Sequence, residues 1–194
     1  MANMDVRSPD RILYKALELF ATSGYDATSV RAICEAAGIT KPTLYHFYGS
    51  KEGVYRSLVD GALEVFRRRL VQEIESPGSP RQRLQRIARC YFEHARDNQE
   101  LMRFLLSLVH KPPSSAPRTD FPRYYEEIVG LISRVVEEGV AGGVFSPGST
   151  ELRMLVLMGA LGEALHGFVI VGRPDLSASL ADRLVETVVQ GWSS

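Results

Sequence analysis

Residues 28–55 read TSVRAICEAAGITKPTLYHFYGSKEGVY and carry the signals for two short helices separated by a tight turn. The first helix is expected to begin at Thr28, whose hydroxyl can cap the free amides of the following turn. Gly38 is expected to end this helix, because glycine readily adopts the left-handed conformation found after many helices. The apolar residue that follows, Ile39, would anchor the turn. The pattern therefore predicts a helix-turn-helix.

The second helix of the pair is predicted to run from about Lys41 to Tyr48. Thr40 provides its N-cap, and Pro42 falls in the first turn, where a missing amide hydrogen costs little. Leu44 and Tyr48 are four residues apart and are expected to pack inward. The other side of this helix would present a polar and aromatic set made up of Lys41, Thr43, Tyr45 and His46.

These outward side chains suit the major groove of DNA. Thr43 offers a hydroxyl and a methyl group, Lys41 a long cation, and Pro42 a flat apolar contact for a thymine methyl. Tyr45 and His46 can reach flanking phosphate oxygens. Short capped helices also occur in many α-helical cores, and a single exposed tyrosine or lysine usually has no function. The combined order of caps, turn and outward side chains favours DNA binding over that alternative.

Two further cations flank this helix pair. Ser50 and Lys51 open a third helix, whose amide-rich start is suited to holding a phosphate. Arg31, on the helix before the turn, can reach a phosphate or a base edge. We therefore expect phosphate contacts on both sides of the recognition helix.

The stretch from Ile12 to Leu58 resembles the TetR family of one-component bacterial regulators, most clearly over LYKALELFATSGYDATSVRAICEAAGITKPTLYHFYGSKEGVY. The resemblance implies that a first helix braces the helix-turn-helix. The residues that it implies to face DNA are Lys41, Pro42, Thr43, Tyr45, His46 and Lys51. Those that it implies to lie close to DNA are Thr28, Ser29 and Arg31, and the predicted DNA-binding set also includes Thr40.

Two positions depart from the family pattern. Phe47 stands where relatives usually carry a polar aromatic residue such as His or Tyr, so the resemblance does not imply a phosphate contact at this position. Tyr48 stands where they usually carry a buried Phe. A buried Tyr48 would need a hydrogen-bond partner for its hydroxyl.

Composition limits the function classes. The chain has 194 residues, of which 45% are hydrophobic, and a formal net charge of zero. It is therefore not a polycation that coats nucleic acid, and its DNA affinity must be local. Cys34 and Cys90 lie in helical patterns and are most simply packed thiols, although a redox-sensing role for Cys34 is conceivable. No segment reaches about 18 uninterrupted apolar residues, so we expect a cytoplasmic protein with no membrane span. The two cysteines have neither the number nor the spacing of a zinc site, and we expect no metal and no cofactor.

Helical periodicity runs through the whole chain and predicts an all-α fold of about nine helices. The N-terminal helix-turn-helix domain is expected to cover residues 1–52. A long helix would join it to a helical ligand-binding and dimerisation domain over residues 53–194. Within this second domain, residues 76–80, SPGSP, predict a break.

Two apolar helices are predicted at the C-terminus, over residues 150–171 and 176–191. They offer more apolar surface than one chain of this length needs to bury, which favours a homodimer built from a four-helix bundle over a purely intramolecular core. The family resemblance implies the same interface. The residues predicted to form it are Leu155, Gly159, Gly162, Leu180, Leu184, Val188 and Trp192.

The middle helices mix bulky apolar side chains with isolated polar ones, which is the composition of a small-molecule pocket. It is equally the composition of an ordinary core edge, and for each residue taken alone that reading is favoured. The residues predicted to line a pocket are Tyr91, His94, Leu105, Tyr124, Met158 and His166.

The sequence therefore predicts a DNA-binding transcriptional regulator that reads an inverted-repeat operator as a homodimer and is released by an unidentified small-molecule effector. Repression is implied by the family resemblance alone. One alternative is a helical scaffold with a relic DNA motif. Another is a di-iron helical enzyme using Glu163 and His166, which stand three residues apart, although no second Glu-x-x-His occurs in the chain.

Overall fold

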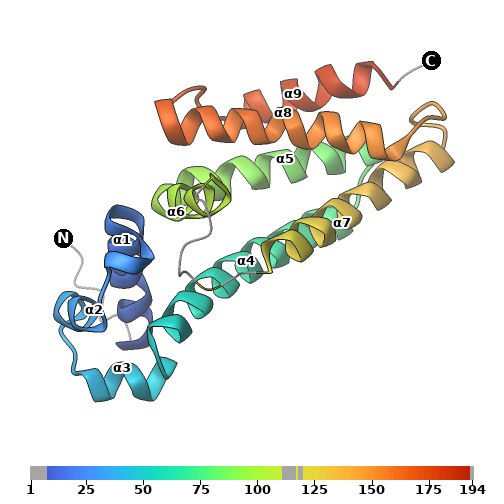
Figure 1. The fold of residues 1–194 in the computed structure, drawn as a ribbon. Helices are drawn as coiled ribbons and strands as arrows, with labels where there is room; N and C mark the ends of the chain where they lie inside the picture. The colour runs from blue at the N-terminus through green and yellow to red at the C-terminus, as the bar shows by residue number, and fades with distance from the viewer. Residues whose placement is uncertain (1–7, 111–116, 118–119, 193–194) are drawn as a thin grey trace. The chain divides into compact units, whose positions relative to one another are not determined.

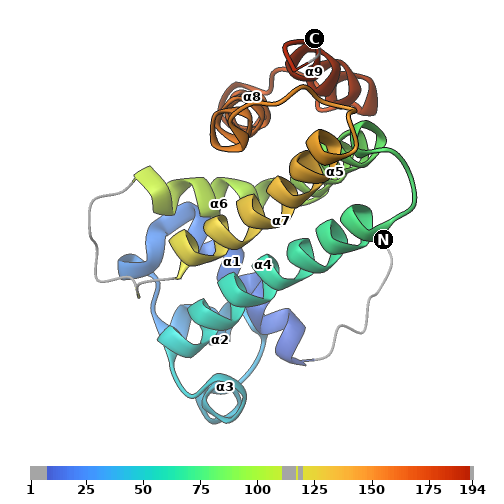
Figure 2. The ribbon, with the colours of Figure 1, turned by 90° about the vertical axis from the view of Figure 1, so that its right-hand side faces the viewer.

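The computed structural model describes residues 8–110, 117 and 120–192, and within them the chain forms nine α-helices and no strand. The predicted all-α class is confirmed (Figures 1 and 2). The helices are α1 Ser8–Ala27, α2 Val30–Ala37, α3 Lys41–Tyr48, α4 Lys51–Glu75, α5 Pro80–Asp97, α6 Gln99–His110, α7 Phe121–Ala141, α8 Thr150–Val171 and α9 Ala178–Gln190.

The chain divides into two compact units. Unit 1 comprises Met1–Leu63 with Glu100–Thr119, and unit 2 comprises Glu64–Gln99 with Asp120–Ser194. Unit 1 therefore contains α6 in addition to the helices of the helix-turn-helix. Along the chain, residues 64–99 of unit 2 separate α6 from the first helices, and the division into residues 1–52 and 53–194 stays a prediction.

An aromatic cluster joins α1, α4 and α6 inside unit 1. The rings of Phe20 and Tyr55 pack edge to face with centroids 5.7 Å apart, and Phe104 of α6 contacts both rings at 6.2 and 5.7 Å. Tyr25 packs against Tyr55 at 5.0 Å. All but Tyr25 are buried, and burial raises the pKa of Tyr55 to about 12. This cluster packs α1, α4 and α6 together in one core.

In unit 2, α5 packs along α9, and two ion pairs fix their register. Arg89 makes a bidentate pair with Asp182, with both nitrogen–oxygen distances at 2.6 Å. Arg81 pairs with Glu186 at 3.0 Å. Both views show α8 and α9 side by side (Figures 1 and 2). The C-terminal helices are thus bound to the middle of the chain as well as to each other.

The predicted break at residues 76–80 is confirmed, because α4 ends at Glu75 and α5 begins at Pro80. Ser79 caps α5 through a capping box with Gln82. Arg86 donates to the carbonyls of Ser76 and Pro77, at 3.0 and 3.1 Å. These bonds hold the connection between the two helices in one conformation.

By length and composition alone, α8 could cross a membrane, with a mean hydropathy of 1.9 over its most apolar window. The core helix of a soluble protein meets the same criterion, so this is weak evidence for a membrane. A third of that window is buried inside unit 2, and its other side carries exposed apolar residues.

Candidate nucleic-acid interface

The N-cap of α2 is Ser29, and the prediction that Thr28 caps this helix is wrong. The Ser29 hydroxyl accepts a hydrogen bond from the amide of Ala32 at 3.0 Å. The side chain of Thr28 is only 2% exposed, and its hydroxyl lies 2.8 Å from the carbonyl of Gly24. Thr28 therefore ties α2 to the end of α1, and its side chain is not available to the DNA that it was predicted to approach.

The turn between α2 and α3 forms as the sequence predicts. Gly38 adopts the left-handed conformation with φ 61°, and its amide donates to the carbonyls of the last turn of α2. Thr40 caps α3 by accepting from the amide of Thr43 at 3.4 Å. The hydroxyls of Thr40 and Thr43 lie 2.9 Å apart and share a hydrogen bond. The start of the recognition helix is thus fixed by its own side chains.

The inner side of α3 is anchored in unit 1. Leu44 is completely buried. The Tyr48 hydroxyl donates to the carbonyl of Pro9 at 2.9 Å, which is the partner that a buried tyrosine was expected to need. Burial raises the pKa of Tyr48, so the hydroxyl stays protonated and able to donate. The inward packing predicted for this pair is confirmed.

The outer side of α3 is open to solvent. Lys41, Pro42, Tyr45 and His46 are exposed, and Thr43 is half-buried. Figure 1 shows α3 at the margin of unit 1, beside α2. All the side chains that were predicted to face DNA from this helix therefore share one accessible surface, which we call the α3 surface.

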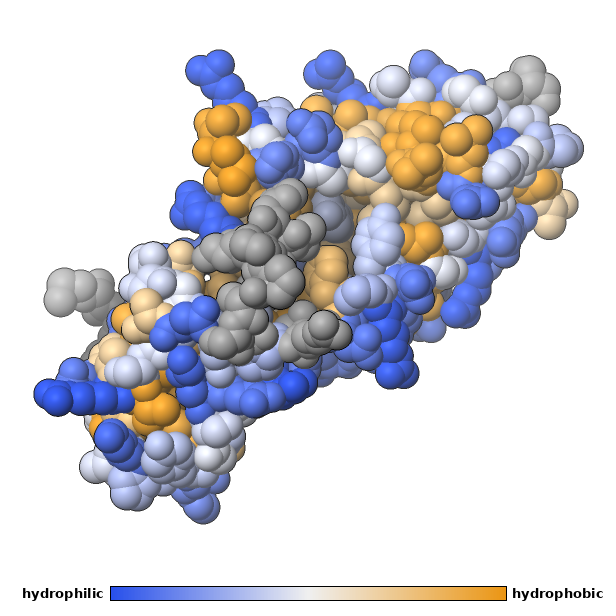
Figure 3. Space-filling view, in the orientation of Figure 1, coloured by the Kyte–Doolittle hydropathy of each residue, from blue (hydrophilic) through white to orange (hydrophobic). Residues whose placement is uncertain are grey.

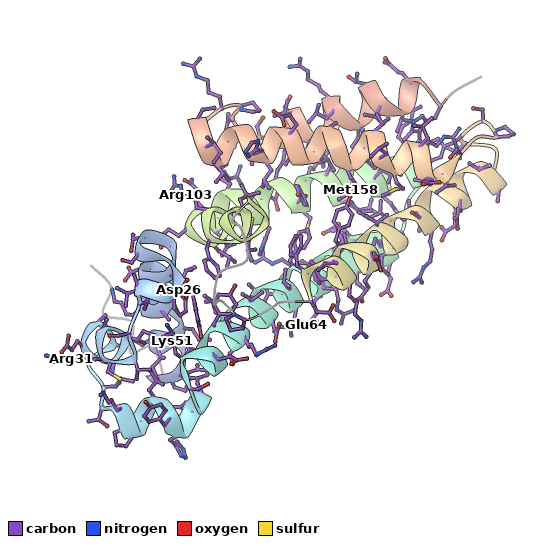
Figure 4. The ribbon with its side chains drawn as sticks, in the orientation of Figure 1. Asp26, Arg31, Lys51, Glu64, Arg103 and Met158 are labelled. Carbon is purple, nitrogen blue, oxygen red and sulfur yellow. The ribbon has the colours of Figure 1, made fainter. Side chains whose placement is uncertain are left out.

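Arg31 is available next to this surface. Its side chain is 78% exposed and pairs with Glu35 of the same helix at 2.7 Å. Figure 4 shows it pointing away from unit 1. An exposed ion pair of this kind is weak, so a phosphate can displace Glu35 at little cost.

Lys51 has a structural role that the sequence did not indicate. Its ammonium group donates to the carbonyls of Tyr25 and Thr28, both at 2.9 Å (Figure 4). An ammonium group has three donors, so one remains for a phosphate. Lys51 can therefore bind a phosphate and support the end of α1 at the same time.

An aromatic and polar cluster in unit 2 contains half of the predicted pocket residues. Phe66 of α4 packs edge to face on Tyr91 at 5.7 Å and lies 5.0 Å from the ring of His94. Burial raises the pKa of Tyr91 to about 12 and, together with Arg69, lowers the pKa of His94. Tyr124 of α7 interacts electrostatically with Tyr91, and its own pKa is raised by burial. Phe66 was not among the residues predicted to line a pocket.

The other predicted pocket residues are dispersed. Leu105 lies on α6 and belongs to unit 1. Met158 lies on the α5-facing side of α8 in Figure 4 and is half-buried. His166 is partly exposed and lies 3.9 Å from Glu163 of the same helix. Their assignment to a pocket remains a prediction.

Exposed apolar side chains follow one side of α8, which we call the α8 surface. It consists of Leu152, Leu155, Val156, Ile170 and Val171. Figure 3 shows hydrophobic surface over α8 toward each end of the helix. Gly159 and Gly162 lie between these ends and have open space where a side chain would stand. On α9, Leu180, Leu184 and Val188 are half-buried.

Trp192 was predicted to belong to this interface, and the structure contradicts that prediction. Its ring is buried against Phe145 in an edge-to-face contact at 5.2 Å. The guanidinium of Arg153 lies 5.3 Å from the same ring. Trp192 therefore closes the core of unit 2, because α8 and the segment after α7 cover it.

Glu163 and His166 were the basis of the enzyme alternative. Both side chains are substantially exposed, and their separation of 3.9 Å is that of an ion pair within one helix. Among the residues that the structure describes, no group of three or more potential metal ligands occurs.

Family comparisons cover both units. A model described as bacterial regulatory proteins of the tetR family matches residues 12–58, and one described as a tetracyclin repressor-like C-terminal domain matches residues 80–168. The HTH-type transcriptional repressor KstR2 of Mycolicibacterium smegmatis is 31% identical over 140 residues, which are 71% of this chain and 67% of the relative.

Two solved structures have the same fold along almost the whole chain. The fatty acid degradation regulator FadR from Bacillus halodurans has a TM-score of 0.80 at 21% identity, covering 95% of this chain and 96% of that one. FadR from Bacillus subtilis, solved in complex with stearoyl-CoA, has a TM-score of 0.74 at 21% identity, covering 94% and 98%. Together with the capped helix-turn-helix and the exposed α3 surface, these matches establish that the chain belongs to the TetR family of DNA-binding transcriptional regulators.

Proposed function

We propose that this protein is a cytoplasmic, non-enzymatic homodimeric repressor that reads an inverted-repeat operator and is released from it by a largely apolar small molecule. The observation that carries the DNA-reading part is the α3 surface. The inner side of α3 is held by buried Leu44 and by the Tyr48–Pro9 hydrogen bond, while the α3 surface stays open to solvent. A rigid helix with a free polar side is what insertion into the major groove requires.

The contacts divide between base reading and phosphate binding. Lys41, Pro42 and Thr43 lie in the first turn of α3, the part of a recognition helix that contacts base edges. Tyr45 and His46 follow one turn later and are exposed, so they suit the flanking phosphates. The N-caps Ser29 and Thr40 fix the two helix starts, and Arg31 and Lys51 supply cations nearby. Thr28 contributes to DNA reading indirectly, because its hydrogen bond to the Gly24 carbonyl holds the start of α2 against α1.

The α8 surface supports the homodimer. Leu155 is 69% exposed, and large apolar side chains flank it on the same helix. The open space at Gly159 and Gly162 would let a partner helix approach closely. A single recognition helix reads too few base pairs for specificity, so a second copy is also needed to read the other half-site. Leu180, Leu184 and Val188 of α9 would complete the bundle.

The unit 2 cluster supports a largely apolar effector. It offers the rings of Phe66, Tyr91 and Tyr124, and a His94 whose lowered pKa favours the neutral form. The Bacillus subtilis relative was solved with stearoyl-CoA, and another structural neighbour is described as a ketosteroid regulator. Stearoyl-CoA carries a long apolar chain, and a ketosteroid is largely apolar. A coupling of about 1–3 kcal/mol between effector and DNA would weaken operator binding about 5- to 150-fold, which is enough to switch transcription.

The DNA-reading proposal is tested by selecting bound sequences from random duplex DNA with the full chain. We expect an inverted repeat whose half-sites lie about one helical turn or slightly more apart. Lys41→Ala or Thr43→Ala should relax discrimination at one or two base pairs, by about 1–3 kcal/mol each. A helical scaffold would enrich no sequence. Equal weakening of all duplexes by both variants would also contradict the assignment.

The effector part is tested separately, by adding stearoyl-CoA and coenzyme A to the complex with the selected duplex. Release by stearoyl-CoA alone, weakened in Tyr91→Ala, is the expected result. Release by both compounds alike would contradict an apolar effector. Stoichiometric iron in the purified protein would revive the enzyme alternative.

A further inference from the structure

Phe47 is an exposed aromatic residue on the recognition helix. Its side chain is 42% exposed, and it follows Thr43 by four residues, so the two share one side of α3. The ring packs edge to face on His46 with centroids 5.1 Å apart, and it lies 6.4 Å from the ring of Tyr48. Because Tyr48 is tethered to Pro9, these two neighbours restrict the orientation of the Phe47 ring.

The chemistry of this ring differs from that of the aromatic residues around it. Tyr45 and His46 carry polar atoms that can bond to water or to a phosphate, whereas Phe47 has no donor or acceptor. It therefore cannot make the hydrogen bond expected of a residue at the edge of a groove. What it offers DNA is an apolar face next to the α3 surface.

In the major groove, the 5-methyl group of thymine is the distinctive apolar group on a base edge, and phenylalanine is among the side chains that contact it. An isolated exposed apolar residue is common on protein surfaces and by itself has no function. Phe47 differs through its place beside Thr43 and His46. We propose that Phe47 contacts the 5-methyl group of a thymine in each half-site and so specifies a base pair next to those read by the first turn of α3. This inference rests on the proposed DNA-reading function.

The test removes single methyl groups from the DNA. The duplex enriched from the random library by the wild-type chain is synthesised with each thymine in turn replaced by deoxyuridine, which pairs identically but lacks the methyl. At one thymine per half-site, we expect the loss of the buried methyl to weaken wild-type binding about fourfold. Phe47→Ala should bind the parent duplex more weakly and should show no further loss at that position. Phe47→Leu, which keeps an apolar side chain, should retain part of the methyl effect.

Two controls separate this contact from others. Tyr14→Ala removes an exposed aromatic side chain of unit 1 that interacts with Glu18, and it should keep the full methyl effect. An apolar contact displaces no condensed counterion, so Phe47→Ala should leave the salt dependence of binding unchanged, whereas the loss of a phosphate contact lowers the slope by about 0.9.

The outcomes distinguish this inference from the proposed function. A wild-type protein that enriches no sequence would overturn both. An enriched duplex with no thymine whose methyl matters would overturn the Phe47 contact and leave DNA reading intact. An equal methyl effect in wild type and Phe47→Ala would assign the thymine to another residue, and would likewise overturn the contact.

Discussion

The ammonium nitrogen of Lys51 lies 4.0 Å from the centroid of the Tyr25 ring and donates to the Tyr25 carbonyl at 2.9 Å. The same group donates to the carbonyl of Thr28 at 2.9 Å. These acceptors lie at the end of α1, where helical carbonyls lack partners within the helix. Lys51 therefore joins the start of α4 to the segment that precedes α2.

Lys51→Ala should lower the free energy of unfolding by about 1–3 kcal/mol, because the part-buried carbonyls of Tyr25 and Thr28 each lose a charged donor, and the Tyr25 carbonyl keeps only the Thr28 amide. Urea denaturation followed by circular dichroism measures this change. The matched control is Lys41→Ala, an exposed lysine of α3, which should leave stability within about 0.5 kcal/mol. Weakened DNA binding by Lys51→Ala at unchanged stability would mean that its role is confined to a phosphate.

Leu155→Glu should convert the protein to monomers, because it would place a charge within the proposed interface on the α8 surface. Sedimentation at micromolar concentration measures the oligomeric state. Operator affinity should fall with it, since the half-sites would be read separately. Val65→Glu, at another exposed apolar position, on α4, is the control and should stay dimeric. A dimer retained in Leu155→Glu would locate the interface elsewhere.

His94 should make stability depend on pH. Burial, and then Arg69, lower its pKa below the ordinary 6.5, against a smaller opposite effect of Asp97. Between the lowered pKa of the folded state and 6.5, the unfolded chain binds more protons, so the free energy of unfolding falls as the pH falls. His94→Gln should flatten this dependence below about pH 6.5, which urea denaturation at a series of pH values measures. Parallel curves for wild type and His94→Gln would contradict this prediction.

Two glycines of α7 provide a matched pair. A Cβ at Gly139 would lie 2.3 Å from ring atoms of buried Phe145, whereas one at Gly130 would meet nothing within 4 Å. Gly139→Ala should therefore destabilise the fold by about 1–3 kcal/mol through overpacking. Gly130→Ala should stabilise it by about 0.5–1 kcal/mol, because alanine favours a helix interior. Thermal denaturation compares them, and equal shifts would mean that Phe145 moves aside freely.

Local signals fixed much of the fold in advance, and long-range contacts account for what they missed. Lys41–Tyr48 was predicted correctly as a helix because Thr40, Gly38 and Pro42 act within a few residues of it. Thr28 and Ser29 can both cap a helix, and the end of α1 decides between them, because it places the carbonyls of Leu19 and Gly24 beside the Thr28 hydroxyl.

Trp192 and Lys51 show the same limit. A tryptophan at the end of an apolar stripe suits an interface or a core equally, and the contacts of Arg153 and Phe145 decide for the core. From the sequence alone, Lys51 would be interpreted as a surface cation. Its hydrogen bond to the Tyr25 carbonyl at the end of α1 shows its structural role. In each case the deciding partner lies far along the chain.

The aromatic cluster of unit 1 also bears on how the DNA-reading part can be isolated. Phe104 of α6 covers Phe20 and Tyr55, although the intervening residues 64–99 belong to unit 2. A fragment that ends at Leu63 would expose the rings of Phe20 and Tyr55 to water and should be poorly soluble. A minimal DNA-reading protein would need α6 grafted back through a short linker, so the two units cannot be exchanged between relatives by a single splice.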